Sequence, residues 1–113
     1  METSIKATDL ELTPALKKYA QDKINSLVKF LPGLTHAWVE LQRTTKHHHK
    51  GEVWRAEANL HAPQHLIRAE AKATDIYAAI DLMKDGLRRE LKSLKDKRTS
   101  ALRGARRSES RNR

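Results

Sequence analysis

The chain has 113 residues, of which 38% are hydrophobic and 4% aromatic, so it suffices for one small domain with an aliphatic core. Lys and Arg number 23 against 14 Asp and Glu, and the net charge of +9 favours a polyanionic partner such as nucleic acid, acidic membrane or acidic protein. The sequence contains no cysteine, no apolar run of membrane-spanning length and no secretory pattern at its start, so we expect a cytoplasmic protein.

The first half of the chain predicts a strand, a helix and a second strand. Residues Ser4–Ala7 suit a short edge strand. Thr13 followed by Pro14 indicates a helix start, because Thr accepts a hydrogen bond from a free N–H and Pro loses none at the first helical position. Pro32-Gly33 is predicted to end this helix, and His36–Thr44 alternates like a half-buried strand. The helix stripe consists of Leu16, Ala20, Ile24, Leu27 and Leu31.

The second half predicts two more strands and a long helix. Glu52–Leu60 and Ile67–Ala73 alternate in polarity, and His61–Gln64 connects them. Asp75 is placed to cap or open a helix that runs to Lys97. Its apolar stripe consists of Ile76, Ile80, Met83, Leu87, Leu91 and Leu94. The order β-α-β-β-β-α predicts an α+β fold of two layers, a four-stranded sheet with two helices on one face.

The composition changes after Lys97. Residues 98–113 contain six arginines, one Leu and no aromatic residue, so they cannot bury enough apolar surface to offset the entropy of ordering. We therefore expect a folded domain over residues 1–97 and a disordered basic tail over residues 98–113.

Three adjacent histidines, His47–His49, lie in the predicted loop Thr44–Gly51. Adjacent loop residues rarely converge on one ion, and no acidic or cysteine ligand is near in the sequence, so we favour a polar, mobile hairpin loop and expect no metal or cofactor. The sequence also lacks a nucleophile signature and a Gly-rich phosphate loop, which argues against an enzyme. Asp9, Glu11 and Asp75 fit turns and caps better than catalysis.

Two tryptophans and the basic residues of the last helix are candidates for binding. Trp54 is in register with the apolar face of its strand and is predicted to pack, whereas Trp38 suits either packing or base stacking. Lys84, Arg88, Lys92 and Lys95 share one flank of the helix, and Arg89 and Lys97 lie on the other with Gly86 and Ser93. Such residues form either a solvated face or a surface for an anionic partner.

Two motifs resemble the ribosome hibernation-promoting factor and ribosome-associated inhibitor family, also called sigma-54 modulation proteins. They are D-I-Y-A-A-I-D at Asp75–Asp81, followed by a Leu/Arg/Lys-rich helix, and L-E-L-T-P-A-L at Leu10–Leu16. The resemblance covers roughly residues 4–97. It implies a fold similar to double-stranded-RNA-binding domains, and binding to the small ribosomal subunit in the channel for mRNA and the A- and P-site tRNAs.

The resemblance also implies that the two helices present basic residues to ribosomal RNA. Lys17, Lys23, Lys29, Arg89 and Lys97 stand where family members are expected to be basic, and we expect Lys84, Arg88, Lys92 and Lys95 to bind ribosomal RNA as well. Basic residues would also be common in the family at the positions of Ser26, Gly86 and Ser93. The flank of the last helix that carries Gly86 and Ser93 therefore has fewer basic residues here.

The family has short forms and long forms, and the long forms add a C-terminal dimerisation domain. This chain is similar to the short forms, and we expect a monomer. Its basic tail differs from the acidic tail of some short inhibitors, so promotion and blocking of ribosome pairing both stay open. A DNA-binding or transcription-modulating protein and a general RNA-binding chaperone are the alternative functions.

Overall fold

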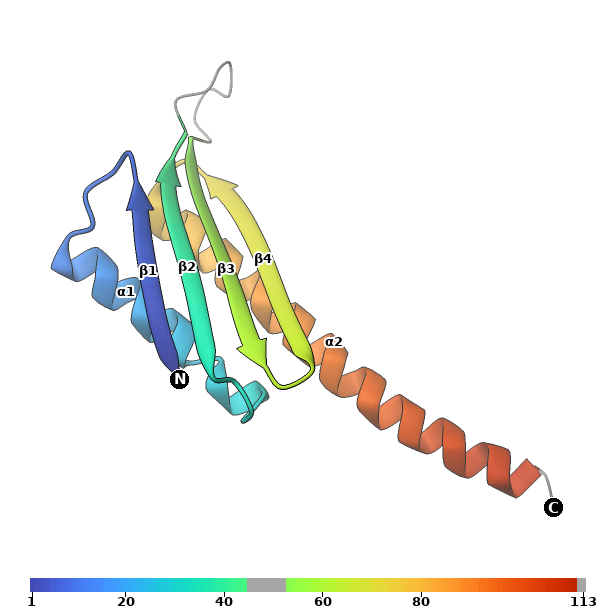
Figure 1. Cartoon of the computed structure of the whole chain (residues 1–113). Helices are drawn as coiled ribbons and strands as arrows, with labels where there is room; N and C mark the ends of the chain where they lie inside the picture. The colour runs from blue at the N-terminus through green and yellow to red at the C-terminus, as the bar shows by residue number, and fades with distance from the viewer. Residues whose placement is uncertain (45–52, 112–113) are drawn as a thin grey trace.

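The computed structural model describes residues 1–44 and 53–111, with side chains up to Leu94. Its elements are β1 (Glu2–Thr8), α1 (Pro14–Asn25), a 3-10 turn η1 (Val28–Phe30), β2 (His36–Arg43), β3 (Trp54–Ala62), β4 (His65–Ala73) and α2 (Ile76–Arg111). The strands form one sheet in the order β1-β2-β3-β4, and both helices cover the same face of it (Figure 1). The predicted two-layer α+β fold is confirmed.

The sheet is mixed. β1 pairs with β2 in parallel, which requires the crossover that α1 provides, and the other two pairs are antiparallel. β3 and β4 meet at a turn formed by Pro63 and Gln64, where Gln64 has a φ of 67°. Pro followed by a positive φ is the pattern of a type II turn. Because this turn needs only those two residues, β3 continues beyond the predicted Leu60 and β4 begins before the predicted Ile67.

The core lies between the helices and the inner face of the sheet. α1 contributes Leu16, Ala20 and Ile24, the central strands contribute their alternating apolar residues, and α2 contributes Ile80, Met83, Leu87 and Leu91. The predicted stripes of both helices therefore face the core. Small residues on β4 let α2 approach closely, since a Cβ added at Gly86 would lie 3.1 Å from the Cβ of Ala69.

The predicted extent of the first helix was too long. α1 ends at Asn25, and the chain continues through a turn into η1 instead of running as α-helix to Leu31. The hydroxyl of Ser26 donates to the Lys23 carbonyl at 2.6 Å, and Leu27 N–H donates to the Ile24 carbonyl three residues back. Side-chain competition of this kind favours a tighter 3-10 turn over continued α-helix.

The last helix is longer than predicted. The sequence indicated an end at Lys97 and disorder beyond it, whereas α2 continues to Arg111. Residues 98–111 contain no proline and several good helix formers, so local propensity supports the continuation. Figure 1 shows the last turns of α2 projecting past the end of the sheet. The division into a domain and a basic tail stays a prediction.

Candidate nucleic-acid interface

Both helices are capped as the sequence predicted. The Thr13 hydroxyl accepts a hydrogen bond from Leu16 N–H at 3.1 Å, and Pro14 follows at the first helical position. The Asp75 carboxylate accepts one from Ala78 N–H at 2.9 Å. Such caps fix where each helix begins. With its apolar stripe against the sheet, each helix then presents its charged residues away from the sheet.

The helical layer carries a surplus of positive charge. Within α1, η1 and α2 up to Leu94, eight residues are basic and four are acidic. The acidic residues are Asp22, Asp81, Asp85 and Glu90, and the basic residues are Lys17, Lys18, Lys23, Lys29, Lys84, Arg88, Arg89 and Lys92. All the basic residues are exposed except Lys23 and Lys84, which are half-buried. The predicted Lys95 and Lys97 belong to α2, but their side chains lie outside the described residues.

Phe30 brings together two cations that are far apart in the sequence. The Nζ of Lys29 lies 5.3 Å from the centre of the Phe30 ring, and the Cζ of Arg88 lies 5.8 Å from it. Both distances fall within the range of cation–π attraction. The pairing places η1 beside the middle of α2 and forms one basic cluster from two elements. No pattern in the sequence around Phe30 predicts this role.

A second contact ties α1 to α2 through Asp81. The Tyr19 hydroxyl donates to Asp81 Oδ1 at 2.6 Å, and Lys23 Nζ lies 3.3 Å from the same oxygen. The hydrogen bonds to Asp81 raise the pKa of Tyr19 and the pKa of Lys23, so both groups stay protonated. Tyr77 packs edge-on against Tyr19. Lys23 thus has an internal partner, unlike the exposed lysines around it.

The two flanks of α2 have different surroundings. The flank with Lys84, Arg88 and Lys92 is the one that carries Asp81, so it turns toward α1 and η1. On the other flank Gly86 packs against β4, where an added Cβ would lie 3.1 Å from the Cβ of Ala69, so a basic side chain there would require the packing to shift by a few tenths of an ångström. Arg89 is exposed beyond it. The structure therefore groups Arg88 with Lys29 and sets Arg89 apart.

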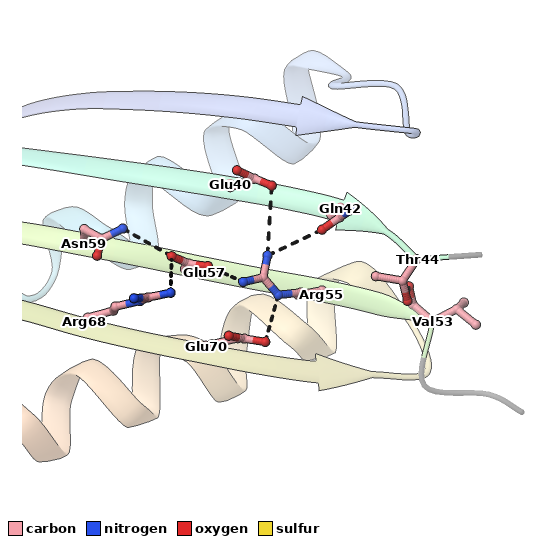
Figure 2. Close-up of polar contacts among 9 residues, drawn as sticks. All are labelled: Glu40, Gln42, Thr44, Val53, Arg55, Glu57, Asn59, Arg68 and Glu70. Carbon is pink, nitrogen blue, oxygen red and sulfur yellow. Dashed lines mark hydrogen bonds and ion pairs between the residues drawn. The ribbon is translucent and has the colours of Figure 1, made fainter. Parts of the chain in front are cut away.

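The opposite face of the sheet is electrically balanced. The strand register puts as many acidic as basic residues on it, namely Glu2, Glu40, Glu57 and Glu70 against Lys6, Arg55, Arg68 and Lys72. Figure 2 shows Arg55 reaching Glu57 on its own strand, Glu40 on β2 and Glu70 on β4. The hydrogen bond to Glu70 raises the pKa of Arg55 and lowers that of Glu70. The surplus of positive charge therefore lies on the helical layer.

The tryptophans differ as the sequence allowed. Trp54 packs against the core with Arg43 over its ring, which confirms the packing prediction, whereas Trp38 is 43% exposed on the open sheet face.

The His47–His49 loop lies outside the described residues. Elsewhere, no three His, Asp or Glu side chains in the described part of the chain lie close enough to hold a metal ion. No helix in residues 1–44 or 53–111 is long and apolar enough to cross a membrane.

The fold and its charge distribution define a small two-layer α+β domain with one basic helical face. The chain belongs to the family described as sigma 54 modulation protein / S30EA ribosomal protein, which matches residues 3–99. The family resemblance seen in the sequence is confirmed. A relative from Klebsiella oxytoca, named ribosome hibernation promoting factor, is 32% identical over 99 residues, which cover 86% of this chain and 96% of the relative.

Solved structures share the fold. The N-terminal domain of Protein Y from Thermus thermophilus superposes with a TM-score of 0.70 at 30% identity, covering 83% of this chain and 99% of that one. A ribosomal subunit interface protein from Coxiella burnetii gives a TM-score of 0.72 at 20% identity, over 85% and 99% of the two chains. The second comparison bears on the fold alone.

Proposed function

We propose that this protein is a ribosome hibernation factor that binds the small ribosomal subunit and inhibits translation without enzymatic chemistry. It acts in the cytoplasm as a monomer and occupies the mRNA channel and the A and P tRNA sites. Family membership and the names of its relatives support the assignment. The observation that carries the choice of surface is the contrast between the basic helical layer and the balanced sheet face.

The proposed contact is electrostatic. Arg88, Lys29 and Lys92 form its centre, Lys17, Lys84 and Arg89 extend it, and Lys95 and Lys97 continue it along α2. Each lysine or arginine that neutralises a phosphate releases counterions, so binding weakens with salt. With about six phosphate contacts, the logarithm of the binding constant falls with a slope of about −4 to −5 against the logarithm of salt concentration. Lys23 contributes less because Asp81 already holds it.

Sedimentation of the purified protein with small ribosomal subunits tests this function. We expect co-sedimentation at low salt, release at high salt, and inhibition of a cell-free translation reaction over the same concentration range. Duplex DNA of equal phosphate concentration serves as the competitor. A protein that stays at the top of the gradient at low salt but binds the duplex would instead be a DNA-binding protein, and the proposal would be abandoned.

A further inference from the structure

The open face of the sheet contains a hollow beside Trp38. Its volume is about 250 Å³, and it crosses β1, β2 and β3. Two rows of the strand register supply its polar walls, Ser4–Trp38–Asn59 and Lys6–Glu40–Glu57. Adjacent rows on one face are two residues apart, about 6.5 Å along the strands. That spacing admits one planar side chain between the indole of Trp38 and the carboxylate of Glu40.

One face of the Trp38 indole is available to such a side chain. The ring of His36 stacks on the indole with centroids 5.3 Å apart and an interplanar angle of 12°, and His61 meets it edge-on at 4.5 Å. Neither histidine lines the hollow, whereas Trp38 does. The histidines therefore hold the ring upright, and its other face is a wall of the hollow.

The hollow also contains a carboxylate with spare acceptor capacity. Glu57 is engaged by Arg55, by Arg68 at 3.0 Å and by Asn59 at 3.4 Å, as Figure 2 shows. Glu40 has a looser contact, since its Oε1 lies 4.0 Å from Arg55, and its side chain is 41% exposed. No ion pair links it to Lys6 in the described residues, although the two are partners in the register. Glu40 can therefore accept hydrogen bonds from a bound ligand.

An aromatic face opposite a carboxylate suits a guanidinium group, which stacks on the ring and donates to the carboxylate from its edge. A nucleobase could also stack on Trp38, but its phosphates would then lie over a face that has no surplus of positive charge. The equal numbers of acidic and basic residues on this face therefore favour a protein ligand over RNA.

We infer that the Trp38 hollow is a docking site for an arginine side chain on a basic protein segment. The assignment of this segment to a protein of the small ribosomal subunit rests on the proposed function. The preference of the hollow for an arginine side chain does not rest on it. With the helical layer on RNA, the sheet face is turned away from that RNA and is free to meet a protein.

Nuclear magnetic resonance on the whole, isotope-labelled chain tests the inference with three probes. They are a short capped peptide of alternating glycine and arginine, its lysine counterpart, and an oligouridylate. The indole N–H of Trp38 reports on the hollow, and that of Trp54 serves as an internal reference. We expect the arginine peptide to shift Trp38, Glu40 and Asn59 at millimolar concentration, the lysine peptide to do so more weakly, and RNA to shift mainly the helices.

Substitutions separate the arginine site from base stacking by the sign of their effects. For the arginine peptide, Trp38→Ala weakens binding about 3- to 30-fold and Glu40→Gln about 2- to 5-fold. Lys6→Ala strengthens it, because it removes a like charge from the hollow. Base stacking would show the opposite response to Lys6→Ala and Glu40→Gln.

Two results would overturn the inference: a Trp38 indole that no peptide shifts, or one that RNA shifts more than the arginine peptide does. The double substitution Arg88→Glu with Lys92→Glu keeps this test independent of the proposed function. It lies on the helical layer, so it should weaken subunit binding at least about 25-fold and leave peptide binding unchanged. Loss of peptide binding in that variant would also refute the assignment to the sheet face.

Discussion

Reversing two charges on α2 should separate binding from folding. Arg88 and Lys92 are both exposed, lie one turn apart and point away from the buried stripe, so Arg88→Glu with Lys92→Glu leaves the core intact. The folding cost is confined to the contact between Arg88 and Phe30, about 0.5–1 kcal/mol. For a domain of this size that lowers the melting temperature by less than about 8 °C.

The binding cost is much larger. Each phosphate contact changes the salt slope by about 0.7–0.9, which corresponds to a factor of about 5–8 in affinity at 0.1 M salt. Loss of two contacts therefore weakens binding about 25- to 60-fold, and the new glutamates add repulsion. The measurement is sedimentation with small subunits at several salt concentrations, where the slope should become less steep by about 1.4–1.8 units.

Arg68→Glu with Lys72→Glu is the matched control. It also replaces one arginine and one lysine four residues apart, and it also costs one contact, the Arg68–Glu57 pair at 3.0 Å. Its net charge equals that of the α2 variant, but it lies on the balanced sheet face. It should bind within a few-fold of the parent protein. Equal weakening by the two variants would mean that only net charge matters, and unchanged binding of the α2 variant would move the interface elsewhere.

The remaining predictions concern single features of the fold. Asp81→Asn should cost about 1–2 kcal/mol of stability in thermal unfolding, yet steepen the salt slope of binding because it frees Lys23 for phosphate; a shallower slope would contradict this. Gly86→Ala should destabilise despite the helix propensity of alanine, and Ala69→Gly should reverse the loss in a double-mutant cycle; additive effects would refute the close contact. Deletion of residues 98–113 should lower subunit affinity with little change in melting temperature, since the core residues of α2 within the described side chains extend only to Leu91; a large drop would show that the segment docks.

The elements of the fold were predictable because their signals are local. Thr13-Pro14 and Asp75 carry the capping chemistry, and the apolar stripe from Ile76 to Leu91 has the period of a helix against a sheet. The end of α1 was missed because Ser26 acts through a hydrogen bond to the backbone, which competes with helix and leaves the hydrophobic period unchanged. The end of α2 was missed because the scarcity of apolar residues after Lys97 indicates that this segment is not buried, but does not indicate whether its backbone is helical.

The candidate interface was predictable only in part, because it depends on which residues face each other across elements. The list of lysines and arginines follows from the sequence, but their grouping does not. Phe30 brings Lys29 and Arg88 together, and Asp81 pairs with Lys23. Both arrangements depend on contacts between residues more than fifty positions apart in the chain. Gly86, which stands where basic residues would be common in the family, allows the close packing of α2 on β4.

The ion network around Arg55 is better explained by its effect on the charge of the sheet face than by a contribution to stability. Partly buried ion pairs lose hydration, and this loss offsets much of their attraction, so a network with three glutamates is weak evidence of a stabilising device. It has a clear effect on charge, however. Arg55 and Arg68 engage Glu57 closely, and Arg55 takes Glu70 at 2.8 Å, while Glu40 at 4.0 Å stays available. The network neutralises most of the acidic residues on the sheet face without adding a surplus of positive charge, so this face neither attracts RNA nor repels a basic protein. The carboxylate of Glu40, next to Trp38, stays available to bind such a protein.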